Sequence, residues 1–185
     1  PSAYTFDGSA SYFFSSSGTK LRTHVGNGNR VPSLYERFGS FFFLNSFFGI
    51  GNPELKPEHS FAFDVGIEQG LLKGRIKLTA AYFYSKVDDE ISYLPTDDFS
   101  APSYFNFDKH LSRGAEFSAS FKPTDSTDIY SSYTFTNSDV RNHRRLSLLP
   151  PFDIISQDKK AFGIPESQFT LVATHRIKRF WINTD

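Results

Sequence analysis

Polar and apolar side chains alternate along several short segments of this 185-residue chain, and the connections between segments are by turns very short and very long. The short connections are residues 15–19, 69–74 and 123–127. The long ones are residues 27–59, 88–111 and 138–167. An up-and-down barrel in an outer membrane has tight turns at one end and large loops at the other, whereas a compact soluble domain rarely has several long connections. The pattern therefore favours an all-β, antiparallel transmembrane barrel.

The alternation is clearest in residues 60–68, 75–87 and 112–122, where each segment has one apolar and one hydrophilic side. Weaker or shorter examples are residues 9–14, 20–26, 128–137 and 168–174, and a further strand begins near Phe180. We expect about eight strands. A lysine facing lipid near the midplane costs roughly 2–4 kcal/mol. In a membrane barrel the apolar rows therefore face outward and the hydrophilic rows line the lumen, whereas in a β-sandwich the apolar rows face inward.

Composition narrows the function classes but leaves both folds open. Hydrophobic residues make up 38% of the chain and the mean hydropathy is -0.38, values that suit a soluble domain and also a barrel that shows lipid only every second strand residue. Twenty basic and twenty acidic residues cancel, which argues against nucleic acid as a partner. Cysteine is absent, which excludes a disulfide scaffold and thiolate metal sites. Aromatic residues reach 17%, which suits either interfacial girdles or a sandwich core.

Five segments, in order, resemble the C-terminal part of the barrel of TonB-dependent outer-membrane receptors. Residues 51–58 read GNPELKPE and resemble that family's GNPxLKPE signature, and residues 30–36 (RVPSLYE) resemble its RAPSLxE element with Val31 in place of a small residue. The third is residues 81–84 (AYFY), followed by Asp88, Asp89 and Ile91. The fourth is residues 113–116 (RGAE), with Asn106 eight residues before Gly114, and the fifth is residues 133–136 (YTFT).

The resemblance implies more than this chain contains. Family members have a plug domain inside a 22-stranded barrel and a segment that engages TonB, and they import a ferric siderophore, cobalamin or similar metal chelate. Residues 1–185 are then expected to be a partial barrel domain without the plug, in the outer membrane of a Gram-negative bacterium. The implied partners are outer-membrane lipid, a metal-chelate or siderophore ligand, and the TonB complex through the absent plug. The chain does not begin with Met, so we expect a piece of a longer protein.

Two segments are candidates for ligand contact at the outer loops. The first precedes and includes a loop with six phenylalanines between positions 38 and 48, and its candidate residues are Tyr35, Arg37, Phe41, Phe42 and Phe43. Aromatic rings there suit a flat or apolar ligand, although packing against neighbouring loops is the alternative. The second is a basic cluster that suits an anionic chelate or lipid phosphates, with Arg141, His143 and Arg144 as candidates. An ordinary solvated run of charge is its alternative.

Catalysis is not expected, because the sequence has neither a GxSxG elbow nor an HExxH helix, and its five histidines are scattered. No cofactor is expected either. Two other functions stay open at this point. One is a small, self-contained outer-membrane barrel with a structural or adhesion role, and the other is a soluble carbohydrate-binding β-sandwich.

Overall fold

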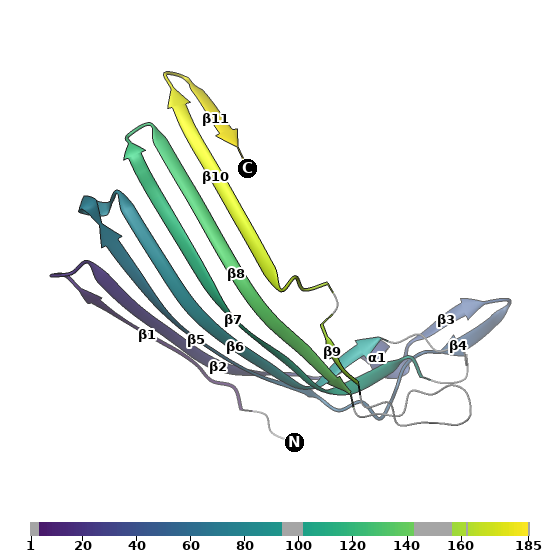
Figure 1. Cartoon of the computed structure of the whole chain (residues 1–185). Helices are drawn as coiled ribbons and strands as arrows, with labels where there is room; N and C mark the ends of the chain where they lie inside the picture. Colours follow the sequence, from purple (N-terminus) through teal and green to yellow (C-terminus); the bar gives the residue numbers. More distant parts are fainter. Residues whose placement is uncertain (1–3, 94–101, 143–156, 162, 185) are drawn as a thin grey trace.

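The computed structural model describes residues 4–93, 102–142, 157–161 and 163–184. One antiparallel sheet dominates it, with strand order β1-β2-β5-β6-β7-β8-β10-β11 and the short β9 paired to β8 (Figure 1). The strands are β1 (Asp7–Phe14), β2 (Thr19–Arg30), β5 (Glu58–Leu71), β6 (Ile76–Tyr93), β7 (Tyr104–Thr124), β8 (Thr127–Asn142), β9 (Gln157–Lys160), β10 (Ser167–Ile177) and β11 (Phe180–Thr184). Strands β1 and β11 are the two edges, so the sheet is an open, curved wall. The predicted fragment of a larger barrel is confirmed, and the self-contained barrel is not supported.

The strand register sorts the side chains into rows that alternate between the two faces of the wall. One row joins Ile67, Ala80, Phe117 and Tyr133, and the next joins Gly66, Ala81, Glu116 and Thr134. Successive strand residues point to opposite faces, so in this part of the wall the apolar rows share one face and the row with Glu116 lies on the other. Among the described residues no second layer covers the apolar face, where Phe117 is 52% and Ile67 43% exposed. The β-sandwich alternative is therefore wrong.

The apolar face has the height that a membrane requires. On β6 its outward residues run from Ile76 to Tyr84, which at 3.4 Å per residue is about 27 Å along the strand. A strand tilt of about 40° reduces this to roughly 20 Å, close to the apolar band of an outer-membrane barrel. The opposite, hydrophilic face is then the lumen side. Within the described residues, no helix is both long enough and apolar enough to cross a membrane.

The long connections differ from the prediction, because the strands continue far past the apolar band. Strands β6 and β7 stay paired as far as Tyr93 and Tyr104, so most of the predicted loop 88–111 is a β-ladder. The predicted loop 27–59 contains the helix α1 (Leu34–Phe38) and a hairpin of β3 (Ser40–Phe43) and β4 (Ser46–Gly49). These segments lack a clean apolar alternation because water or protein, and not lipid, faces both sides of the strands. The backbone ladder forms all the same.

Tight connections join the strands at the other end, as predicted. Residues 15–18 join β1 to β2, the 3-10 turn η1 (Leu72–Gly74) precedes β6, and residues 125–126 join β7 to β8. In η1 the backbone is left-handed at Leu72, Lys73 and Gly74, with φ of 51°, 56° and 86°. We call this the turn end of the wall, and the opposite end, which carries α1 and the β3–β4 hairpin, the outer end.

Gly114 lies on the lumen face of β7 where the wall allows no side chain. A Cβ placed there would be 2.1 Å from the carbonyl oxygen of Phe135 and 2.5 Å from the ring of Phe83. The Phe83 ring, on the neighbouring strand, therefore covers the glycine directly. This contact explains the glycine in the RGAE segment as a requirement of packing.

Candidate functional site

Helix α1 begins with a capping box directly after β2. The Ser33 hydroxyl accepts a hydrogen bond from the Glu36 backbone N–H at 3.2 Å, and the Glu36 carboxylate accepts one from the Ser33 N–H at 2.7 Å. Pro32 precedes the cap and favours the extended backbone that an N-cap residue needs. The serine and the glutamate of the RVPSLYE segment are thus explained by local structure.

Arg30 ties this helix to the wall through two carboxylates. Its Nε and Nη2 donate to Glu58 at 2.6 and 2.7 Å, and its Nη1 donates to Glu36 at 2.8 Å. Arg30 and Glu58 are register partners on β2 and β5, on the lumen face. Glu58 also accepts the Ile91 N–H at 2.6 Å, so the triad joins β2, α1, β5 and β6. One arginine with two carboxylates leaves a net charge of about −1 on the triad.

All three members of this triad lie beyond the apolar band and stay ionised. Burial opposes ionisation of Glu58, but hydrogen bonds from Arg30 and from the Ile91 N–H outweigh it, so the pKa of Glu58 is lowered. Burial likewise opposes ionisation of Glu36, and the bonds from Ser33 and Arg30 lower the pKa of that carboxyl. The bonds to Glu58 and Glu36 raise the pKa of Arg30. Only 13% of the Glu58 side chain is exposed, so the docking of α1 depends on this charge state.

Besides the Arg30 triad, two buried asparagines hold the GNPELKPE segment against β6 and β7. Asn106 is 2% exposed; its Oδ1 accepts the Lys56 N–H at 2.9 Å, and its Nδ2 donates to the carbonyls of Lys56 and Asp89 at 3.0 and 2.7 Å. The Asn106 side-chain amide thus bonds both the N–H and the carbonyl of Lys56, as the backbone of a neighbouring strand would. Asn52 donates to the Tyr104 carbonyl at 3.0 Å and accepts the Glu54 N–H at 3.0 Å.

A small apolar core completes this docking. Its members Ile50, Leu55 and Ile91 are the only described hydrophobic residues counted as buried, at 7–9% exposure. Gly51 has no room for a side chain, because a Cβ there would lie 2.5 Å from backbone atoms of residues 37 and 38. Asn106 and Ile91 are register partners on the same face as Gly114 and Glu116. Residues 31–57, which we call the insertion, are therefore anchored to the lumen side of the wall at its outer end.

The β3–β4 hairpin projects from this anchored base (Figure 1). Phe41 pairs with Phe48 and Phe42 with Phe47, with ring centroids 5.5 and 5.0 Å apart. Because paired residues alternate between faces, both faces of the hairpin carry phenylalanine. Phe42, Phe43 and Phe47 are 59%, 47% and 78% exposed. Residues 39–53 contain no charged side chain, so the hairpin presents apolar surface on both sides.

Tyr35 and Arg37, the other two candidates in this segment, take different places. The Tyr35 ring packs edge-on to Tyr104 at 6.3 Å, and Tyr104 packs against Tyr93 at 5.2 Å, so three tyrosines gather beside α1. Burial, followed by the neighbouring Tyr35 and Glu36, raises the pKa of Tyr104. The sequence analysis missed Tyr93 and Tyr104, because they belong to strands that continue through the predicted loop.

Arg37 is held within the insertion. Its Nη2 donates to the Pro53 carbonyl at 2.7 Å, and its guanidinium lies 5.3 Å from the centre of the Phe38 ring. Its Nε is buried and has no hydrogen-bond partner in the described part of the chain. Arg37 therefore braces the turn at Pro53, and its predicted contact with a ligand stays a prediction.

Arg141, the candidate of the basic cluster that lies in the described part of the chain, is not on the face of the wall that anchors the insertion. Arg141 lies on β8 opposite Lys109 of β7, and the alternation of side chains assigns both to the face opposite Glu116. His143 and Arg144 lie outside the described residues. Their role toward an anionic ligand or lipid phosphate stays a prediction.

A chain of polar side chains on the lumen face was also missed. The His110 Nδ1 is 3.1 Å from the Glu90 carboxylate, its Nε2 is 2.9 Å from the Ser138 hydroxyl, and Ser138 is 2.5 Å from the Ser112 hydroxyl. Ser138 is only 4% exposed and lies within strand β8. Nucleophilic serines of hydrolases are instead exposed on sharp turns, so we interpret this chain as a brace between β6, β7 and β8. Within the described residues no group of three or more acidic or histidine side chains is arranged to hold a metal ion.

Comparisons with known proteins agree with this architecture. The family model described as "TonB dependent receptor-like, beta-barrel" matches residues 1–182. A search of curated protein sequences finds no match. Similar solved structures include the copper transporter OprC (TM-score 0.64, 17% identity, 92% of this chain and 23% of that one). The ferripyoverdine receptor of the outer membrane of Pseudomonas aeruginosa is another, with a TM-score of 0.62 and 16% identity over 93% of this chain and 20% of that one. The FrpB iron transporter from Neisseria meningitidis is a third, with a TM-score of 0.65 and 12% identity over 95% of this chain and 24% of that one.

The chain spans about a fifth to a quarter of the length of these receptors. The likeness to them shows the fold, and the family match extends over nearly all of the sequence. The wall with its outward apolar band is that of an outer-membrane barrel, and the family is one of transport receptors and not of enzymes. This chain belongs to the TonB-dependent receptor family, as part of its β-barrel.

Proposed function

We propose that the protein containing this chain takes up a metal chelate of the siderophore type across the outer membrane, and that the insertion forms part of its outer binding surface. The observation that carries the proposal is the anchoring of the insertion on the lumen side. A ligand entering the barrel meets this side, whereas lipid meets the other. Transport through TonB would use the plug domain that receptors of this family carry.

The chemistry of the hairpin supports a ligand with apolar or flat parts. Its paired rings of Phe42 and Phe47 are exposed and uncharged, and aromatic contacts of this kind contribute about 0.5–1.5 kcal/mol each beyond the buried area. Tyr35, with its neighbours Tyr93 and Tyr104, adds phenol groups beside the base of the hairpin. The printed names of similar receptors refer to copper, ferripyoverdine and iron, which supports a siderophore or metal chelate more than cobalamin.

A binding panel on the full-length receptor tests the proposal. Ferric catecholates, ferric hydroxamates, copper and cobalamin are titrated against the wild type and a Phe42→Ala, Phe47→Ala double variant. Loss of two ring contacts, about 2 kcal/mol together, is expected to weaken binding of the transported chelate by roughly 30-fold. Phe169→Ala is the matched control, because Phe169 is equally exposed, at 66%, but lies on the outward face.

Cells provide the second half of the test. Uptake of the bound chelate should require TonB, and the double variant should lose uptake at low chelate concentration while Phe169→Ala retains it. Binding of none of the panel, or uptake that is unchanged in a strain without TonB, contradicts the proposal. Binding that is unaffected by the double variant leaves a transport role but removes the hairpin from it.

A further inference from the structure

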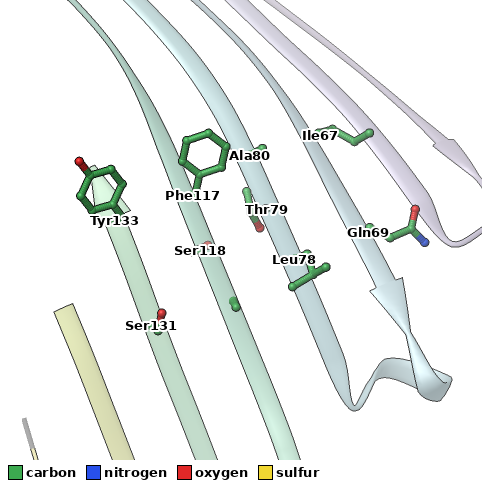
Figure 2. A pocket seen from close by; sticks show the side chains of 10 residues that line it. Ile67, Gln69, Leu78, Thr79, Ala80, Phe117, Ser118, Ser131 and Tyr133 are labelled. Atoms are coloured by element: carbon green, nitrogen blue, oxygen red, sulfur yellow. The ribbon is translucent and has the colours of Figure 1, made fainter. Parts of the chain in front are cut away.

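A hollow of about 380 Å³ lies on the outward face of the wall, across β5, β6, β7 and β8 (Figure 2). It forms where two small side chains, Ala119 and Ser131, are register neighbours. Larger side chains surround them, namely Ile67, Leu78, Phe117 and Tyr133. The hollow is therefore a dip in the lipid-facing surface, far from the insertion and from the lumen.

The occupant of this hollow has to be apolar. The outward positions of the two rows that form it carry no charged side chain. Its one amide, Gln69, is already paired: its Nε2 donates to the carbonyl of Ser17 at 2.7 Å, and its Oε1 accepts from Thr19 at 2.6 Å. This amide therefore requires no polar ligand, and the face that contains the hollow is the one that contacts hydrocarbon.

The turn end of the same strands supplies positive charge close to the hollow. Lys73 lies in η1 and Arg75 directly precedes β6. Arg75 interacts with the next turn, where its Nη1 donates to the Pro123 carbonyl at 3.1 Å and its Nη2 lies 3.6 Å from Asp125. Lys73 makes no ion pair with any residue in the described part of the chain. The turn therefore keeps an exposed positive charge at the edge of the apolar band.

The spacing between hollow and turn suits one phospholipid. Leu78 follows Gly74 by four residues, about 14 Å along a strand and roughly 10 Å along the membrane normal at a 40° tilt. Half of a bilayer's hydrocarbon core is about 15 Å thick. A lipid with its phosphate at Lys73 would thus place the middle and end of an acyl chain at the hollow.

We propose that this hollow holds an acyl chain of an anionic phospholipid from the periplasmic leaflet, whose headgroup phosphate pairs with Lys73. The surrounding bilayer supplies the lipid, since tight turns of outer-membrane barrels lie on the periplasmic side. Small residues between large ones give this position of the wall a concave surface that a flexible chain fills. A rigid second barrel would fill it less well.

The test uses the full-length receptor, purified in detergent and analysed by native mass spectrometry after addition of phosphatidylglycerol or phosphatidylcholine. The wild type is expected to retain one phosphatidylglycerol in preference to phosphatidylcholine. Ala119→Phe fills the hollow and should lower this occupancy at least tenfold. Ala115→Phe is the matched control, because Ala115 is an outward alanine of the same strand, four residues away.

A second variant keeps the proposal testable if Ala119→Phe fails to assemble. Lys73→Glu leaves the wall intact and should abolish the preference for phosphatidylglycerol over phosphatidylcholine. Equal occupancy in the wild type and Ala119→Phe, or an unchanged preference in Lys73→Glu, overturns the proposal. So does a receptor dimer that forms in the wild type and is lost in Ala119→Phe, because a second copy would then cover the hollow.

Discussion

Replacement of Asn106 by Ala should release the insertion from the wall without unfolding the barrel. The buried amide makes three hydrogen bonds to backbone groups of Lys56 and Asp89. At about 1 kcal/mol net for each bond, the loss is about 3 kcal/mol, which corresponds to roughly a hundredfold change in a local opening equilibrium. Hydrogen exchange at the Lys56 amide, measured on the full-length receptor, should accelerate by about that factor.

Two further variants sharpen this test. Asn106→Asp keeps the acceptor for the Lys56 N–H but turns a carboxylate oxygen toward two carbonyls, so it should accelerate exchange at least as much as Asn106→Ala. Asn183→Ala, at an exposed position of β11, should leave exchange at Lys56 unchanged. An acceleration of less than about threefold in Asn106→Ala would refute the view that this amide holds the insertion in place.

Three other perturbations follow from the wall and its anchors. Gly114→Ala should destabilise the barrel by about 1–3 kcal/mol, and adding Phe83→Leu should restore only part of this in a heat-modifiability assay, because the clash with a backbone carbonyl persists. In the wild type the pKa values of Glu36 and Glu58 are lowered, so docking of α1 should be fully stable above the ordinary glutamate pKa of 4.5 and should loosen as the pH falls through the lowered values. Arg30→Met should reverse this dependence in normalised hydrogen exchange, because two mostly buried carboxylates that have lost their shared cation gain from protonation. An unchanged dependence contradicts the triad. Phe117→Arg places a charge within the apolar band, whereas Ile129→Arg places one in the outward row nearest the turns. Phe117→Arg should therefore impair membrane assembly more than Ile129→Arg, and the reverse order would contradict the assigned depth of the two residues in the membrane.

The wall was predictable because a single rule governs it. Each membrane-facing strand must be apolar at every second position, so residues such as Val65, Leu78 and Phe117 reveal both the strand and its face. The tight turns were predictable as well, from the short stretches of polar residues and glycine between strands. These features depend on local sequence and on the solvent around the barrel.

The outer end was predicted less well, because its structure depends on contacts between distant residues. Beyond the apolar band both faces of β6 and β7 meet polar surroundings, so alternation stops while pairing continues to Tyr93 and Tyr104. The family resemblance marked Arg30, Glu58 and Asn106 by position but not by partner. Their joint task, to hold the insertion on the lumen face, becomes visible only when the register places them side by side.

The extension of β6 and β7 past the lipid has a consequence for the proposed ligand contacts. Tyr93 lies nine residues beyond Tyr84, which lifts the rim by roughly 20 Å above the hydrocarbon boundary. At that height bulk electrolyte reaches the exposed side chains, and the fields of exposed charges decay within about 8 Å at physiological ionic strength. This screening does not weaken contacts between apolar surfaces and phenylalanine rings, so the proposed binding through the β3–β4 hairpin should be as strong at high ionic strength as at low ionic strength.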